Sequence, residues 1–337
     1  MPTSSPPQSR PGVVILGTGG TIAGSTAAAL GHHYTAGVLS IEELLASAPG
    51  LADIAQLRCQ QLFSLDSVEL DLPRQLQLAR RVAQIAADPD VDGVVITHGT
   101  DTMEESAYLL HLLVGTDKPV VLTGAMRPAD APGADGPANI LDAVTVAASP
   151  AAHGLGTLVV FGGAVHSGRE VSKRISSRLD AFDSFHGPLG DVSEQGLLLY
   201  GRPARRFGAD SAFELASLPE SLPSVELLLS HPDMPASICR AILDSGAAGI
   251  VHAGPGGGNV ATPVARMLDE ARERGVVVVR SSRVGAGVVA RNGAVSDTEH
   301  GWVAAGDLNP FKARVLLALA LTQTSDVATI QRLFDTH

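Results

Sequence analysis

Cysteine, runs of basic residues and long apolar stretches are all scarce in this chain of 337 residues. Its two cysteines, Cys59 and Cys239, are too few for a disulfide framework, and neither belongs to a closely spaced pair that could bind a metal. The longest apolar candidate for a membrane span covers residues 315–321, whereas crossing a bilayer needs roughly 20 apolar residues. We therefore predict a soluble protein without a disulfide scaffold.

Positive charge is also in deficit. The chain has 24 Lys and Arg against 35 Asp and Glu, a formal net charge of −11, and no Lys/Arg-rich run. This balance argues against a surface for nucleic acid or for an acidic membrane. Residues 1–7 are polar and proline-rich, without the charged start and apolar stretch of a secretory signal. We expect a cytoplasmic protein.

Apolar runs of β-branched residues alternate with longer helical patterns along most of the chain. Because the apolar runs are continuous, they are typical of strands covered on both faces of a sheet. The alternation predicts an α/β fold, with a larger N-terminal domain on a doubly wound, mostly parallel sheet and a smaller C-terminal α/β domain. The predicted strands include residues 13–16, 94–96, 120–122 and 158–161, and the predicted helices include residues 72–87 and 104–114.

The regular pattern fades between residues 201 and 223, where Arg, Gly, Ala, Ser and Pro dominate, so we assign this stretch to an interdomain linker. The remaining expected parts are a disordered tail (1–11), an N-terminal catalytic domain (12–200) and a C-terminal α/β domain (224–337). In the last of these, strands are predicted at residues 225–229, 249–252 and 276–279. Asn309 before Pro310, and Ser325 or Asp326, are expected to cap its last two helices.

In an open α/β sheet, ligands bind beyond the carboxyl ends of the strands, and a glycine-rich segment, residues 17–24, follows the first predicted strand. This segment is not a nucleotide loop, because Ile22 stands where the dinucleotide pattern needs glycine and Ser25 stands where the phosphate-loop pattern needs lysine. The glycines would allow a sharp turn and a close approach of substrate to the Thr21 hydroxyl. On this segment alone, a chemical role for Thr21 and a role in turn hydrogen bonds stay equally open.

A second polar segment, residues 97–105, lies between a predicted strand and a predicted helix. Asp101 and Glu104 have the spacing of a helix-capping pair, which would be a structural role. Thr100 and Asp101 would also lie at a helix N-terminus, where free amides and the helix dipole favour a carboxylate or a developing oxyanion. The local sequence allows His98 to be a general base or a buried structural imidazole.

A hydroxyl nucleophile needs a base, since a lone threonine does not ionise at neutral pH. Lys173 either lies on a solvated basic loop or, if it lies beside Asp101, could shuttle a proton through Thr100. The chain has no Gly-x-Ser-x-Gly elbow and no His-Glu-x-x-His zinc motif, and His32 and His33 adjoin no further set of ligands. We therefore expect neither a metal nor an organic cofactor.

Together these segments resemble the two signature motifs of bacterial-type L-asparaginases, here residues 18–24 (TGGTIAG) and 98–105 (HGTDTMEE). The likeness extends over nearly the whole chain through residues 123–128, 134–137, 187–190, 280–284 and 308–310. Chance does not produce agreement at so many ordered segments.

The resemblance implies a two-domain amidohydrolase that converts L-asparagine to L-aspartate and ammonia through a threonine acyl-enzyme and assembles as a homotetramer, a dimer of intimate dimers. Thr21 would be the nucleophile and Tyr34 the neighbouring phenol, on a mobile loop. The implied catalytic set is Thr21, Tyr34, Thr100, Asp101 and Lys173. The implied substrate-binding set is Gly20, Ser67, Thr100, Asp101 and Asn259, of which the partner subunit of the intimate dimer would supply Asn259.

Two positions depart from the family pattern. Val68 stands where the best-known secreted members have Gln or Glu, and Ala294 stands where some members present Glu or Ser from the partner subunit. Both of those side chains normally help to bind the substrate ammonium group, a role that Glu69 could take over. The nucleophile motifs are unaffected.

Asparagine and glutamine differ by one methylene, which a pocket discriminates by only about 1–3 kcal/mol. We expect hydrolysis of L-asparagine with weaker activity on L-glutamine. The alternatives are a dual glutaminase-asparaginase, a related amidase such as an amidotransferase subunit that feeds ammonia to a partner, and a non-catalytic amino-acid sensor. The presence of Thr21, Thr100 and Lys173 argues against the sensor.

Overall fold

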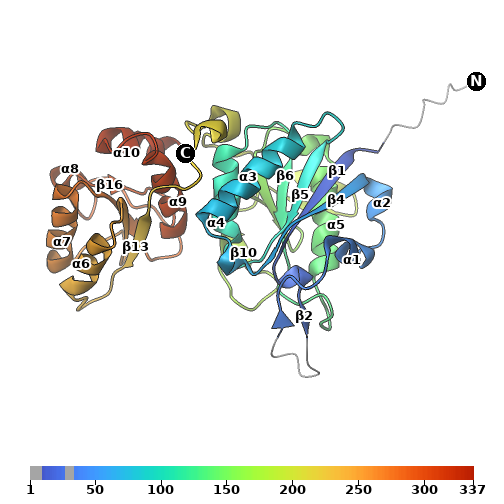
Figure 1. The fold of residues 1–337 in the computed structure, drawn as a ribbon, viewed down its shortest axis with the longest axis horizontal. Helices are drawn as coiled ribbons and strands as arrows, with labels where there is room; N and C mark the ends of the chain where they lie inside the picture. The colour runs from blue at the N-terminus through green and yellow to red at the C-terminus, as the bar shows by residue number, and fades with distance from the viewer. Residues whose placement is uncertain (1–9, 27–33) are drawn as a thin grey trace, which may run out of the picture. The chain divides into compact units, whose positions relative to one another are not determined.

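The computed structural model describes residues 10–26 and 34–337 and divides the chain into two compact units, which we call the N-terminal unit (up to Ala204) and the C-terminal unit (from Arg205) (Figure 1). The division lies within the stretch predicted as a linker. Residues 205–223 belong to the C-terminal unit, where Gln323 donates a hydrogen bond to the Ala212 carbonyl at 2.8 Å. Of the predicted tail, residues 1–9 lie outside the described part, and Arg10 donates to the Ala52 carbonyl at 2.6 Å.

The N-terminal unit is built on a sheet with the strand order β12-β11-β8-β7-β6-β5-β1-β4. The parallel strands are β1 (Gly12–Gly19), β4 (Gln56–Leu65), β5 (Gly93–Thr97), β6 (Val120–Thr123) and β7 (Thr157–Phe161). The strands that pair antiparallel are β8 (Ala164–Ser167), β11 (Gly190–Ser193) and β12 (Gly196–Leu199). The predicted doubly wound, mostly parallel sheet is confirmed.

Helices cover both faces of this sheet, which explains why its central strands are apolar throughout. Helices α1 (Ile41–Ala46), α2 (Leu51–Ile54) and α5 (Gly136–Ala147) pack into one core cluster with alternate residues of the strands, such as Val13 and Ile15. Helices α3 (Leu72–Ala86) and α4 (Met103–Leu113) cover the other face (Figure 1). The Asp71 side chain caps α3 by accepting from the Arg74 amide.

The C-terminal unit has a parallel sheet in the order β13-β14-β15-β16. Its strands are β13 (Val225–Leu229), β14 (Gly249–Gly254), β15 (Val277–Ser282) and β16 (Val303–Ala304). Its helices are α6 (Ala236–Asp244), α7 (Thr262–Glu273), α8 (Asp297–His300), α9 (Pro310–Ala320) and α10 (Val327–Thr336). The caps predicted at Asn309 and Asp326 are confirmed, since each side chain accepts from the amide three residues ahead.

Cys59, on β4, is a half-buried free thiol whose pKa is raised by burial and by Glu42, which keeps it in its unreactive protonated form. The side chain of Cys239 lies outside what the structure describes. In the described part of the chain, no helix has both the length and the apolar character of a membrane span.

Candidate active site

Glycines allow the loops after β1 and β5 to touch. Gly19 and Gly20 have φ angles of 103° and 80°, a conformation that side-chain-bearing residues rarely adopt. A Cβ added to Gly20 would overlap the backbone of Gly99, so the two loops come this close only because residue 20 lacks a side chain. The glycine-rich segment therefore delivers Thr21, which opens the 3-10 turn η1 (Thr21–Ala23), to the end of β5.

The loop after β4 joins the same cluster. Ser67 opens the turn η2 (Ser67–Glu69), and a Cβ on Gly99 would lie 2.7 Å from the Ser67 Cβ and Oγ. The Thr102 hydroxyl donates to the Ser67 carbonyl at 2.8 Å. Since β1 lies between β4 and β5, this is the point where the strand order reverses, the usual ligand site of such sheets.

Helix α4 begins with an open N-terminus at this cluster. Thr102 is its N-cap residue, but the Thr102 side chain makes no cap because it is bonded to Ser67. The N-cap is therefore Thr102 and not Asp101, so the capping role left open for Asp101 and Glu104 does not hold. Among the described residues, none accepts a hydrogen bond from the Thr100 amide, which leaves it available to an anionic ligand.

Lys173 lies beside Thr100 and Asp101. It ends strand β9 (Val171–Lys173), which is held by antiparallel pairing with β10 (Phe182–Ser184). Its Nζ donates to Thr100 Oγ1 at 2.8 Å and to Asp101 Oδ1 at 2.6 Å. The Lys173 side chain is 14% exposed and that of Asp101 is 59% exposed, so the amine faces the interior while the carboxylate reaches solvent. Because the Thr100 oxygen accepts from Lys173, its own proton is free to point elsewhere.

The backbone of Tyr34 is held in place by strand pairing. Strand β3 (Tyr34–Thr35) pairs antiparallel with β2 (Ser25–Thr26), which follows η1. Asp130 anchors β2 by accepting from the Ser25 hydroxyl at 2.7 Å and from the Thr26 amide at 2.9 Å, and these bonds lower the pKa of Asp130. The sequence offers no signal for this anchor, because its partners are more than 100 residues away. The Tyr34 side chain, and the residues His32 and His33, lie outside what the structure describes.

The Ser67 hydroxyl is a buried polar group in need of a partner. Its residue is 1% exposed, and within the described chain its Oγ makes no hydrogen bond. An unsatisfied buried hydroxyl costs about 1–3 kcal/mol, which a ligand oxygen at this position would recover. The cluster therefore contains a ready donor for an anionic or carbonyl group.

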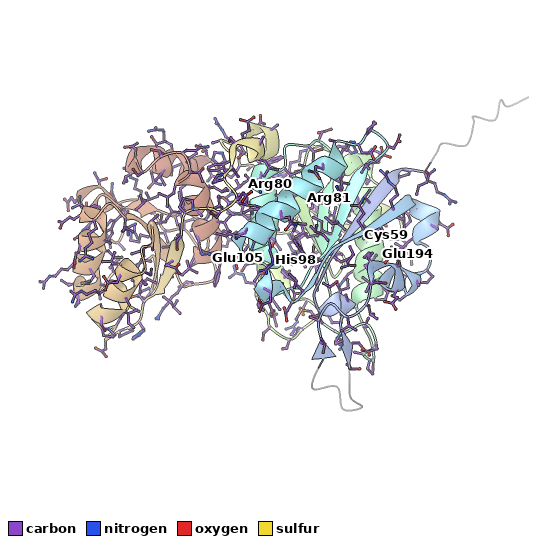
Figure 2. All side chains as sticks on the ribbon, viewed as in Figure 1. Cys59, Arg80, Arg81, His98, Glu105 and Glu194 are labelled. Carbon is purple, nitrogen blue, oxygen red and sulfur yellow. The ribbon has the colours of Figure 1, made fainter. Side chains whose placement is uncertain are left out.

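His98 is not placed as a general base. It lies between the end of β5 and the start of α4 (Figure 2), with Nδ1 2.7 Å from the Gly99 carbonyl and Nε2 2.9 Å from the Ser106 hydroxyl. Burial lowers its pKa to about 4, although the bond to Gly99 opposes this, so the ring is neutral at neutral pH. Because both ring nitrogens have hydrogen-bond partners, His98 is a buried structural imidazole and not a general base.

Asn259 belongs to the C-terminal unit, on the loop after β14. The backbone N–H of Asn259 donates to the Pro255 carbonyl at 2.9 Å. Arg280 holds the loop by donating to the Gly257 carbonyl at 2.8 Å. The same guanidinium pairs with Asp297 through bonds of 2.7 and 2.6 Å, and neither side chain is exposed to solvent. The loop that carries Asn259 is therefore held by a buried arginine, which is itself fixed by a buried ion pair.

The N-terminal unit brings together five of the predicted site residues, namely Gly20, Ser67, Thr100, Asp101 and Lys173. Thr21 directly follows Gly20. The described residues contain no group of three or more His, Cys, Asp or Glu that could hold a metal ion. Hydroxyls, a lysine and an open helix N-terminus are groups that can serve nucleophilic attack on a carbonyl.

The chain is similar to known proteins over nearly its whole length. The family model "Asparaginase, N-terminal" matches residues 12–205, and "Glutaminase/Asparaginase C-terminal domain" matches residues 224–334. The chain is 45% identical to the glutaminase-asparaginase of Pseudomonas fluorescens, over 96% of this chain and 89% of the relative. It is 43% identical to L-asparaginase 2 of Escherichia coli, over 97% and 93%. A crystal structure described as a probable cytoplasmic L-asparaginase from Campylobacter jejuni superposes with a TM-score of 0.93 at 40% identity, over 98% of this chain and all of that one.

Proposed function

This chain belongs to the asparaginase family, and from that premise we propose that it hydrolyses L-asparagine to L-aspartate and ammonia. The observation that carries the proposal is the Lys173 amine bonded to both Thr100 and Asp101, beside the loop that presents Thr21. Relatives named L-asparaginase and glutaminase-asparaginase both support an amidohydrolase.

The proposed reaction is a double displacement. The Thr21 oxygen attacks the side-chain amide carbon, and its proton passes through the Thr100 hydroxyl, which the Lys173 amine holds in place, to the leaving nitrogen. Ammonia departs from a β-aspartyl ester, which water, activated through the same pair, then hydrolyses to release aspartate. Splitting the reaction and stabilising the oxyanion with amides near Thr100 supply the rate gain, because an amide is a poor electrophile.

Substrate recognition is proposed to use two polar groups of the cluster that can still form hydrogen bonds. The Ser67 hydroxyl donates to the α-carboxylate, and the exposed Asp101 carboxylate accepts from the α-ammonium. Asn259 is supplied by the partner subunit of an intimate dimer. Val68 is 62% exposed and, like Ala294, offers the ammonium group no hydrogen bond, so Asp101 and Glu69 carry more of that contact here.

The test is ammonia release from L-asparagine and L-glutamine, assayed in parallel with the purified chain. We expect kcat/KM for asparagine to exceed that for glutamine by about 10- to 200-fold, the discrimination available from one methylene. Equal values would instead show a dual glutaminase-asparaginase, the activity named for three of the relatives. Calorimetric binding of asparagine without ammonia release would favour a sensor, and activity only with a partner protein would favour an amidotransferase subunit.

Replacing Lys173 with methionine is expected to lower kcat for asparagine by about 100-fold or more, because the Thr100 hydroxyl that relays the proton loses the amine that holds it in place. Arg174→Met is the matched control, since it removes a neighbouring, exposed positive charge. It should change kcat less than threefold. Steady-state ammonia assays with both variants check this, and an Arg174→Met loss as large as that of Lys173→Met would show a general charge effect instead.

The assembly and the location are proposals of the same kind. We expect a homotetramer, which sedimentation velocity of the purified chain tests, a monomer being the contrary result.

We also propose a cytoplasmic location, supported by the Campylobacter jejuni structure, although a relative from Haemophilus influenzae is described as periplasmic. Cell fractionation with an antibody to this chain distinguishes the two compartments.

A further inference from the structure

The His98 ring ties the end of β5 to helix α4 through one defined tautomer. A carbonyl oxygen can only accept, so the 2.7 Å contact between Nδ1 and the Gly99 carbonyl requires that Nδ1 carries the proton. The ring is neutral, and therefore Nε2 accepts from the Ser106 hydroxyl at 2.9 Å. The ring is fully buried and both of its nitrogens are satisfied.

This bond determines which way the next amide points. In a trans peptide the carbonyl and the following N–H point in opposite directions, and the described chain has no cis peptide bond. Because the Gly99 carbonyl points at His98, the Thr100 N–H points away from the ring. Thr100 is 5% exposed, its side chain meets Lys173, and no described residue accepts from its amide.

The orientation of this peptide needs an external restraint. Gly99 has no side chain, and glycine turns readily between backbone conformations that other residues avoid. The open N-terminus of α4 adds no cap, because the Thr102 side chain is bonded to Ser67. The hydrogen bond from His98 is therefore the contact that selects one orientation of the Gly99–Thr100 peptide.

We propose that His98 is a positioning residue, which holds the Gly99–Thr100 peptide so that the Thr100 amide donates to the oxyanion that forms during amide hydrolysis. This inference rests on the proposed function. It gives the histidine of the second motif a role that involves no proton transfer. Its expected signature is a loss in kcat at nearly constant KM, because the oxyanion exists only in the transition state and the intermediates.

The experiment compares three variants of the full chain. His98→Asn keeps a donor at the position of Nδ1, His98→Gln places its amide at the position of Nε2, and His98→Leu keeps neither. We expect kcat on asparagine within about fivefold of the unmodified protein for His98→Asn and about 30- to 100-fold lower for His98→Gln and His98→Leu, with KM within about threefold throughout.

A matched control is available in the C-terminal unit. His252 is also fully buried with its pKa lowered to about 4, by burial and by the Arg280 charge, but neither of its nitrogens has a hydrogen-bond partner in the described chain. His252→Leu should therefore leave kcat within twofold and shows what the loss of a buried imidazole does by itself.

The outcomes separate the two proposals. An unmodified protein that releases no ammonia from asparagine or glutamine overturns the proposed function. An active protein in which His98→Leu keeps its kcat, or in which His98→Asn is as impaired as His98→Gln, overturns the positioning role alone. If His98→Leu does not fold, as judged by circular dichroism, the comparison of the Asn and Gln variants still decides.

Discussion

Thr21→Ala is expected to lower kcat for L-asparagine at least about 1,000-fold, because the reaction loses the oxygen that forms the covalent ester. Thr21 follows Gly20, whose backbone touches that of Gly99, so the variant leaves the loop contact itself intact. Thr21→Ser keeps a hydroxyl and should stay within about tenfold of the unmodified protein. Steady-state ammonia release measures all three proteins.

Binding provides the control for this prediction. Ser67 and Asp101 are unchanged in Thr21→Ala, so calorimetry should show L-aspartate affinity within about threefold of the unmodified protein. Intact-mass spectrometry after an acid quench should detect a covalent aspartyl adduct on the unmodified protein and none on Thr21→Ala. Near-normal turnover by Thr21→Ala would refute the nucleophile assignment.

Arg280→Met is expected to destabilise the C-terminal unit by about 3–5 kcal/mol, because it leaves the Asp297 carboxylate buried without its counter-charge. Arg280 and Asp297 have no solvent exposure, and Arg280 also donates to the carbonyls of Gly257 and Ala290. Urea denaturation monitored by circular dichroism measures the change in the free energy of unfolding.

Two companion variants show whether charge burial is the cause. Arg280→Met combined with Asp297→Leu removes both buried charges and should recover most of the lost stability, since apolar residues can replace a buried ion pair at little cost. Arg272→Met removes an exposed pair with Glu273, in which Arg272 is 45% exposed, and should cost less than about 1 kcal/mol. A double variant that is less stable than Arg280→Met would contradict the explanation.

Strands that the sequence pattern missed lie at the margins of the large sheet. β4 is an edge strand, and polar residues such as Arg58, Gln60 and Gln61 interrupt its apolar pattern. Helix α3 supplies a partner for one of them, since Arg81 donates to the Gln60 side chain at 2.6 Å (Figure 2 labels Arg81 on α3). A pattern search finds strands buried on both faces more readily than strands with one solvated edge.

Local interactions account for what the sequence by itself determined. Continuous apolar runs predicted the central strands, Asn309 and Asp326 predicted two helix starts, and the motifs at 18–24 and 98–105 indicated the family. Each of these signals depends on neighbouring residues along the chain, which sequence periodicity and capping rules describe.

Only the tertiary structure decided which groups meet. Lys173 bonds to Thr100 from 73 residues away, and the order β4-β1-β5 brings Ser67, Gly20 and Gly99 into contact. The same contacts decided between the alternatives that the second motif left open, since the Thr102 hydroxyl donates to the Ser67 carbonyl and His98 bonds to the Gly99 carbonyl. The physical reason is that sheet order and backbone packing select these partners, and neither is recorded in the spacing of residues along one segment.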